Sequence, residues 1–456
     1  MIHYRGLKRR VCTLALLGIL EAAMPSVVYA NDMFDDFWKA MLGGKVDFFA
    51  RYRYELVDDD ALTASRKSIR TAHASTLRTA LGYKTGAFHH FGGYVQMEDV
   101  RDVFSGDFND GSNGKTQFAT VVDPEGTELK QAYLWYEGDA KASLGNTTVK
   151  LGRQDITRRD APLHRFIGNI LWRQHWQMFD AVSIYNTSLP KTTLSYAYIW
   201  NVNRIFGEDA PDPLSDFSSD SHILDAAYEG FKFGRLEAYA YLLDFTNPDA
   251  ARARRFSSQT YGGRFAGSYP VNKVWKMIYT AEYAHQSDYG VNRLDYDAHY
   301  ALGEFGIGIK TNRPYFDNLI FKFSYEYLGS DGGREAFQTP LGTNHAFQGW
   351  ADRFIITPRD GIKDAFFTFK ANIYGANFTA IYHDFRSDHD DYGYGSEIDL
   401  QLDKTFKKHV LVGLKYADYN ADKNTTNLAQ NFNTRNPNLN AAADVSIFWG
   451  FVEVKF

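Results

Sequence analysis

Seven residues between positions 153 and 176 combine guanidinium groups with indole rings. The segment from residue 152 to residue 176 reads GRQDITRRDAPLHRFIGNILWRQHW. Guanidinium groups fork onto carboxylates and stack on aromatic planes, and aromatic rings contact the faces of sugars. This mixture predicts a loop that guides an acidic sugar, although a constriction loop folded inward for small solutes fits the same residues. The predicted guiding residues are Arg153, Arg158, Arg159, Arg165, Arg173, Trp172 and Trp176.

Charged residues elsewhere alternate with aromatic ones. In GKVDFFARYRYELVDDD, residues 44–60, Tyr52 and Tyr54 fall on one side of an extended chain, and Arg51 and Arg53 fall on the other. A period of two is typical of a β-strand with one apolar and one polar face. The same phase puts ten basic residues on polar faces, and we predict that they line a pore and steer anions: Arg51, Arg53, Arg78, Lys130, Lys150, Arg264, Lys276, Lys322, Lys370 and Lys415.

Acidic residues share these polar faces, among them Glu98, Glu282, Glu326 and Glu397. Rings of Lys and Arg favour anions in a pore. Pairing of opposite charges across strands would instead fill the interior without selectivity. Both interpretations are consistent with the sequence.

The alternation recurs about eighteen times along the chain. The predicted strands start near residues 45, 70, 88, 128, 147, 179, 192, 222, 235, 258, 273, 296, 318, 365, 376, 393, 409 and 444. Short links such as 84–86 and 374–375 alternate with long polar ones such as 101–127 and 330–364. This rhythm predicts an all-β fold, a transmembrane up-and-down antiparallel barrel of about 18 strands with short periplasmic turns and long extracellular loops.

The direction of the two faces follows from the cost of charge in lipid. An Arg or Lys on the lipid side near the midplane costs about 2–4 kcal/mol. The apolar parity is therefore expected to contact outer-membrane lipid, and the charged parity to face a wet lumen. A content of 30 Tyr and 35 Phe at a mean hydropathy of −0.40 fits such a barrel.

The ends of the chain indicate an exported protein of the Gram-negative outer membrane. Residues 1–30 are predicted to be a signal peptide, with basic residues, an apolar run and a small-residue site ending at Ala30. Residues 31–43 are predicted to be a short amphipathic lead-in at the periplasmic rim or in the barrel mouth, and residues 44–456 the barrel. The terminal Phe456 resembles the signal that the barrel assembly machinery reads.

Charge and cysteine content exclude two classes of protein. The single cysteine, Cys12, lies in the predicted signal peptide, so a disulfide scaffold is excluded. Residues 1–30 hold four basic residues and one acidic residue, which leaves 46 basic and 54 acidic residues, a net charge of −8. An acidic exported chain is not expected to bind nucleic acid.

Signatures of covalent chemistry are missing from the sequence. It contains no HExxH, Walker A or G-x-S-x-G motif and no paired-cysteine metal site. The run from Asp388 to Asp391 could offer oxygen ligands to a divalent cation, but a solvated charged turn is favoured. We therefore expect no catalytic residue, no metal and no cofactor.

Several stretches resemble the alginate export family of outer-membrane porins over nearly the whole mature chain. They are RYRYE at 51–55, DPEGTEL at 123–129, LGRQ at 151–154, WRQ at 172–174, FD at 179–180, YIWN at 198–201 and GWAD at 349–352. The resemblance implies an 18-stranded barrel with a basic constriction, through which the founding member exports the anionic polysaccharide alginate.

Together these features predict a passive outer-membrane channel for polar or anionic solutes, with acidic saccharides such as alginate-like polymers or oligomers as the leading class. A general porin for small nutrients is the alternative within this class. An outer-membrane barrel hydrolase is the alternative from another class. It would need a nucleophile beside a histidine such as His164 or His383, and the sequence offers no obvious one.

Overall fold

The computed structural model describes residues 30–61, 68–158, 164–211, 213–247, 254–313, 315–422 and 443–456. The predicted signal peptide lies outside the described residues except for Ala30. No helix in the described part of the chain is long and apolar enough to cross a membrane. The helices and strands are α2 (Ala30–Leu42), β1 (Lys45–Asp59), β2 (Ala72–Lys84), β3 (Phe91–Asp107), β4 (Gly126–Glu137), β5 (Thr147–Gln154), β6 (Met178–Asn186), β7 (Thr192–Asn203), β8 (Asp216–Tyr228), β9 (Gly234–Leu243), β10 (Ser258–Pro270), β11 (Trp275–Asp288), β12 (Asp297–Ile309), β13 (Asp317–Leu328), β14 (Ser330–Asp331), β15 (Glu335–Ala336), a 3-10 turn (Asn344–Ala346), β16 (Ile362–Ile373), β17 (Ala376–Arg386), β18 (Gly393–Phe406), β19 (Val410–Ala421) and β20 (Val445–Lys455).

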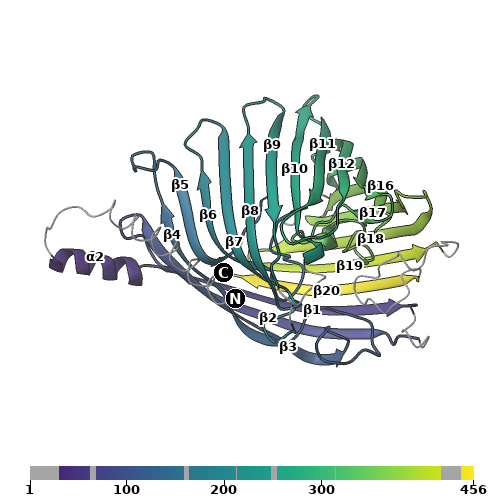
Figure 1. The fold of residues 1–456 in the computed structure, drawn as a ribbon, viewed down its shortest axis with the longest axis horizontal. Coiled ribbons are helices and arrows are strands. Elements are labelled where there is room, and N and C mark those ends of the chain that lie inside the picture. The colour runs from purple at the N-terminus through teal and green to yellow at the C-terminus, as the bar shows by residue number, and fades with distance from the viewer. Residues whose placement is uncertain are drawn as a thin grey trace.

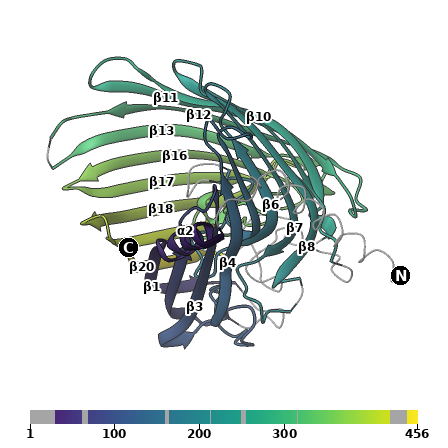
Figure 2. The same cartoon turned by 90° about the vertical axis from the view of Figure 1, so that its left-hand side faces the viewer.

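Eighteen of these strands form one antiparallel sheet that closes on itself (Figure 1). Each long strand pairs with the next along the chain, and β13 pairs with β16 across the small hairpin β14–β15. The barrel closes where β20 pairs with β1, from Phe49 opposite Lys455 to Asp59 opposite Val445. Figure 2 shows the wall curving from β10 and β11 through β16 and β18 to β20 and β1. The predicted up-and-down barrel is confirmed.

The predicted strand starts agree with the structure to within three residues, except that of β8. This strand begins at Asp216 rather than near residue 222. Its first residues, DFSSDS, were expected to form a loop because they are small and polar. In the barrel Ser219 and Ser221 point inward, and their hydroxyl oxygens lie 2.7 Å apart. A polar interior accepts such residues, so polarity alone does not mark the end of a strand here.

Turns of two and three residues join strands at the rim that carries α2. Tyr374 and Gly375 link β16 to β17 with φ of 50° and 75°, and the three-residue link between β18 and β19 begins with Lys407 and Lys408, with φ of 45° and 64°. Positive φ at both central positions matches the right-handed twist of paired strands. In Figure 1 the short hairpins run along the upper and left-hand edge, on the side of α2.

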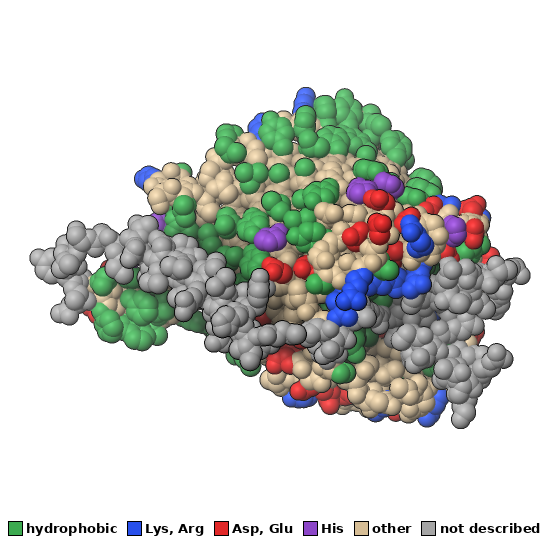
Figure 3. Space-filling model, viewed as in Figure 1, with side chains coloured by type: hydrophobic (Ala, Val, Ile, Leu, Met, Phe, Trp, Pro, Cys, Tyr) green, Lys and Arg blue, Asp and Glu red, His purple; other side chains and the backbone are tan. Residues whose placement is uncertain are grey.

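The apolar parity of the strands faces outward and the charged parity faces inward. Leu81, Phe305 and Phe323 are more than half exposed, whereas Arg53 and Glu326 are 1 % exposed. Hydrophobic side chains spread over the outer face in Figure 3, and acidic and basic side chains gather toward the right-hand end. The barrel therefore has an apolar outer surface, as predicted, and its interior holds these charged residues together with buried apolar and aromatic side chains such as Ile223, Tyr300 and Trp449.

Candidate solute pathway inside the barrel

Two long loops fold back into the barrel. They are the 155–177 loop, described at 155–158 and 164–177, and the 329–361 loop. The loops pair with each other, since the Gly168 amide donates to the Leu341 carbonyl over 3.0 Å and the Thr343 amide to the His164 carbonyl over 3.1 Å. Both loops also contact inward-facing residues of several strands, as described below. They therefore fill much of the barrel interior.

One wall holds the 155–177 loop with arginines. Both terminal nitrogens of Arg51 donate to the Leu171 carbonyl over 2.8 Å. Arg53 donates to the Trp172 carbonyl and to the Asp123 carboxylate, and its guanidinium lies 4.9 Å from the centre of the Trp172 ring. Strand β1 presents both arginines because they share the inward parity. They bind the loop backbone and are at most 2 % exposed.

A second network on this wall joins β2, β3 and β4. The guanidinium of Arg78 lies 2.6 Å from the Glu98 carboxylate and 3.3 Å above the Trp176 ring. Lys130 lies 3.0 Å from the same carboxylate, and Nδ1 of His175 lies 2.8 Å from it. Glu98 is therefore surrounded by basic side chains, and the charges compensate one another.

Glu98, Glu128 and His175 bring three possible metal ligands within 4.8 Å of one another. Both ring nitrogens of His175 face acceptors, the Glu98 carboxylate and the Pro124 carbonyl, the latter at 3.0 Å. Arg78 and Lys130 also pair with Glu98, so a cation would compete with two basic side chains for the same carboxylate. These residues are therefore better explained as a charge-compensated contact.

The centre of the loops is an ion-pair network. Arg173 lies 3.5 Å from Glu55 and 3.1 Å from Asp352, with Asp123 at 3.9 Å. Burial alone would lower the pKa of Arg173, but the three carboxylates outweigh it and raise the pKa above its ordinary value. Burial alone would raise the pKa of Asp123, yet Arg53 and Arg173 hold it below its ordinary value. The pairing therefore favours the charged forms of Arg173 and Asp123.

Strands β13 and β18 hold the loops with carboxylates. Nε of Arg165 lies 2.7 Å from Glu326 of β13. The Ala351 amide donates to Glu397 over 2.7 Å, and the Trp350 amide donates to Asp399 over 3.2 Å. Strand β18 presents both carboxylates on its inward parity. The acidic side chains of the interior thus bind loop groups.

A buried lysine joins both loops to β19. Nζ of Lys415 lies 2.6 Å from Nε2 of His345, 3.8 Å from the Trp350 ring centre and 4.3 Å from that of Trp172. Nδ1 of His345 lies 2.7 Å from Asp352, and its ring stacks on Trp172 at 4.7 Å with an interplanar angle of 4°. Burial lowers the pKa of His345 to about 3, and Lys415 adds to this against the opposing effect of Asp352.

Five other predicted lining residues also share the inward parity but lie outside the loop contacts. They are Lys150, Arg264, Lys276, Lys322 and Lys370, which are half-buried or exposed. Several of these residues sit near the short turns, as Lys276 is the second residue of β11 and Lys370 is four residues before Tyr374. Arg264 pairs with Glu237 at 3.0 Å, and Lys322 pairs with Glu304. Lys276 and Lys370 form no ion pair with any described residue.

The predicted guiding residues do not lie together. Arg165, Arg173, Trp172 and Trp176 belong to the buried loop contacts described above. Nε of Arg158 lies 3.2 Å from Asp225 on β8. Arg153 belongs to β5, on the outward parity, and pairs with Asp180 at 2.9 Å and Glu208 at 3.1 Å. Arg159 lies outside the described residues.

The 329–361 loop supplies residues that the sequence analysis did not assign to the interior, among them His345, Trp350 and Asp352. The composition of this loop indicates burial, because an exposed loop rarely carries several large apolar residues such as Phe337, Leu341 and Trp350. All three are less than 9 % exposed. Asp388, from the predicted charged turn, accepts from Tyr327 and from the Ser330 amide over 2.9 Å each. It therefore supports this loop.

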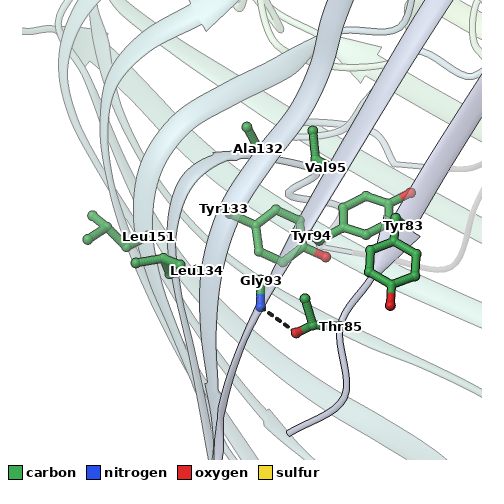
Figure 4. Close-up of a pocket in the computed structure, with 9 residues that line it drawn as sticks. All are labelled: Tyr83, Thr85, Gly93, Tyr94, Val95, Ala132, Tyr133, Leu134 and Leu151. Carbon is green, nitrogen blue, oxygen red and sulfur yellow. Dashed lines mark hydrogen bonds between the residues drawn. The ribbon is translucent and has the colours of Figure 1, made fainter. Parts of the chain in front are cut away.

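A groove between β2, β3, β4 and β5 lies on the outer surface (Figure 4). Its lining includes Tyr83, Val95, Leu134 and Leu151, all of the outward parity, around Gly93. A Cβ atom placed at Gly93 would lie 3.9 Å from its nearest neighbouring atoms, so the space above this glycine is open. The groove faces the lipid side and is not part of the pathway.

A closed 18-stranded barrel with an apolar exterior, a charged interior and inserted loops is the architecture of an outer-membrane channel. A model of the alginate export family matches residues 45–304, and the chain belongs to this family. It is an outer-membrane channel protein of Gram-negative bacteria. A search of curated proteins found no match.

Solved outer-membrane channels share the fold. Pseudomonas aeruginosa OpdK with vanillate superposes with a TM-score of 0.64 at 14 % identity, covering 91 % of this chain and 99 % of that one. Acinetobacter baumannii OccAB2 gives 0.64 at 14 % identity, with 92 % and 99 % covered. Pseudomonas aeruginosa OccD3 (OpdP) gives 0.60 at 12 % identity, with 91 % of each chain covered. At such identities the likeness concerns the fold alone.

Proposed function

We propose that this protein is a passive channel for polar or anionic solutes, with acidic saccharides such as alginate-like polymers or oligomers as the leading class. The observation that carries the proposal is the lysine lining of the inner wall near the short turns. Lys276 and Lys370 are exposed there without an acidic partner among the described residues. The ammonium of Lys150 lies 4.7 Å from the Tyr133 ring centre, also without a described ion pair. Cations of this kind bias a pore toward anions.

Two parts of the interior have different roles in this proposal: the loop half, which the two inserted loops occupy, and the half near the short turns. Charges in the loop half are paired, as in Arg78 with Glu98 and Arg165 with Glu326, so they contribute little net electrostatic field. Steering is assigned to Lys150, Lys276 and Lys370, with smaller contributions from the paired Arg264 and Lys322. The loop half sets the width of the path. Selectivity then comes from electrostatics and size, without covalent chemistry, cofactor or energy input.

Family membership supports the saccharide class, because the matching model is named for alginate export. A neighbouring solved structure contains vanillate, a small anion, which supports anionic solutes more broadly. We further propose that outer-membrane lipid surrounds the apolar exterior and that the barrel assembly machinery inserts the protein, reading β20 and the terminal Phe456 that follows it.

Planar-bilayer recordings of the purified protein test the steering role. In a gradient of KCl, the reversal potential of the wild-type channel should indicate anion preference. A Lys276→Gln, Lys370→Gln double variant should lose much of this preference, whereas Lys232→Gln, on the turn before β9, should retain it. Equal reversal potentials in all three proteins would refute the assignment.

A general porin for small nutrients is the second candidate, favoured by the two loops that occupy the interior. Uronate oligomers of increasing length distinguish the two. A saccharide channel should be blocked more strongly as the oligomer grows, because each added carboxylate reaches another lysine. A small-nutrient porin should admit monomers and show no gain in block with length.

A further inference from the structure

Helix α2 carries an apolar face that the described part of the barrel covers only near Phe37. Its large apolar residues, at positions 33, 34, 37, 38, 41 and 42, follow the three- and four-residue spacing of one helix face. Asp35, Asp36 and Lys39 occupy the other side, and Lys39 pairs with Asp36 at 3.1 Å. Phe34 is 59 % exposed and Leu42 78 % exposed. A patch of large apolar side chains that the protein itself leaves exposed indicates contact with a membrane or another molecule.

Three hydrogen bonds fix the end of α2 to the rim of the barrel. The Gly86 amide donates to the Ala40 carbonyl over 2.9 Å, and the Tyr83 hydroxyl donates to the Met41 carbonyl over 2.5 Å. The Gly44 amide donates back to the Tyr83 hydroxyl over 3.1 Å. Tyr83 lies on the outward parity one residue before the end of β2. The helix is therefore tied to the side of the wall that faces lipid.

The apolar face of α2 continues into the lipid-facing surface of the barrel. Phe37 packs edge-on against Phe88 of the β2–β3 turn, with ring centres 5.5 Å apart. After Gly43 and Gly44 the chain enters β1, where Val46 is 65 % exposed on the outward parity opposite Tyr83. Figure 3 shows apolar side chains of α2, at the left of the view, on the molecular surface.

We propose that α2 is an interfacial helix that lies in the periplasmic leaflet of the outer membrane, with its aromatic face in the lipid. Trp and Tyr prefer the boundary between lipid and water, and amphipathic helices bury an apolar face there. The two acidic residues on the opposite face turn toward the periplasm. Since Lys39 pairs with one of these carboxylates and the described part of α2 has no cluster of basic residues, attachment depends on apolar contact rather than on attraction to anionic headgroups.

Single-cysteine labelling of the mature protein tests this placement. The sequence has no cysteine after residue 30, so one introduced thiol is labelled uniquely. Phe34→Cys and Asp35→Cys place a polarity-sensitive dye on opposite faces of α2, and Leu81→Cys provides a lipid-facing reference on β2. The proteins are reconstituted in nanodiscs of phosphatidylethanolamine and phosphatidylglycerol with a nitroxide quencher on the acyl chain.

The dye at position 34 should emit at shorter wavelength and lose emission to the quencher nearly as completely as the dye at 81. The dye at 35 should do neither, and raising KCl to molar concentration should leave the contrast unchanged. Equal quenching at 34 and 35 would overturn the proposal. So would an unquenched dye at 34, the result expected if a periplasmic protein or a second copy of the chain covers this face.

A second measurement separates lipid contact from damage to the helix. With the dye on Leu42→Cys, the Phe34→Ser, Trp38→Ser double variant should lose quenching, because most of the apolar face is gone. Asp35→Ser, Asp36→Ser with the same dye should retain it. Retention in both double variants would show that the aromatic residues do not hold α2 in the lipid, and would also overturn the proposal.

Discussion

Nζ of Lys415 on β19 lies 2.6 Å from Nε2 of His345 in the 329–361 loop. A lysine can only donate hydrogen bonds, so Nε2 of His345 accepts this one. Nδ1 then carries the ring proton and donates to Asp352 at 2.7 Å. Because burial keeps the pKa of His345 near 3, the imidazole is neutral at ordinary pH and fits this arrangement. One wall strand is thereby joined to the inserted loop.

Replacing Lys415 by methionine should loosen the loop. The variant loses the hydrogen bond to His345 and the contacts of the ammonium with three indole rings, which are worth about 2 kcal/mol when buried. We expect a lower denaturant midpoint in detergent and more frequent conductance fluctuations. Lys404→Met removes a half-buried cation at the turn rim, which lies above Phe406 and donates to the Tyr374 carbonyl, and should cost about 1 kcal/mol. Equal losses in both variants would contradict the role of Lys415.

Acid should favour release of the loop. The pKa of His345 is about 3 in the folded loop and close to 6.5 once the ring is in water. The released form therefore takes up a proton as the pH falls below about 6.5, and the folded form does so only near 3, so loop stability declines across this window. The groups facing His345 are Asp352, Lys415 and Arg173. Conductance recorded between pH 7 and pH 4 should become noisier, and His345→Gln should weaken this dependence. A variant with unchanged dependence would rule out His345 as its source.

Removing Arg173 should be among the most damaging single changes in the interior. Arg173→Met removes the guanidinium that lies 3.5 Å from Glu55 and 3.1 Å from Asp352, and breaking a buried ion pair of this kind costs about 3–5 kcal/mol. Arg334→Gln in the 329–361 loop breaks a more exposed pair with Asp331 and should cost about 0–1 kcal/mol. Denaturant unfolding in detergent measures both, and similar midpoints would argue against the network.

Arg51 should affect the loop more than ion selectivity. Its terminal nitrogens bind the carbonyls of Leu171 and Trp172, and the side chain is 2 % exposed. Arg51→Gln should therefore alter conductance fluctuations while the reversal potential stays close to that of the wild type. A change in reversal potential as large as that in the Lys276→Gln, Lys370→Gln variant would instead place Arg51 in the open path.

Charge on the outward parity should destabilise the barrel in lipid. Phe323→Arg puts a guanidinium on the lipid side near the middle of β13, at a cost of about 2–4 kcal/mol if it lies at the midplane. Ser324→Arg, at the next residue, places the guanidinium in the barrel interior, so any loss of stability in this variant reports on interior packing and not on contact with lipid. Unfolding in lipid vesicles should show the loss for Phe323→Arg, and the loss should shrink in detergent. The same loss in both media would indicate a cause other than lipid.

The sequence was sufficient for the barrel, because each strand repeats the same two-residue period for physical reasons that act locally. Tyr52 and Arg53 occupy opposite faces whatever the rest of the chain does, and the cost of charge in lipid decides which face turns outward. The pattern failed at β8, where small polar residues suit a polar interior as well as a loop. Short links between consecutive strands then predict that each strand pairs with the next one along the chain.

Only the tertiary structure decided which of the inward charges remain available to a solute. Arg51 and Lys276 have the same parity and similar neighbours in sequence, yet Arg51 binds the backbone of a loop more than 100 residues away and Lys276 lies uncovered. Pairing of this kind depends on where the two loops enter the barrel, and on the carboxylates and carbonyls they bring. Those contacts join residues far apart in the chain, so no local period encodes them.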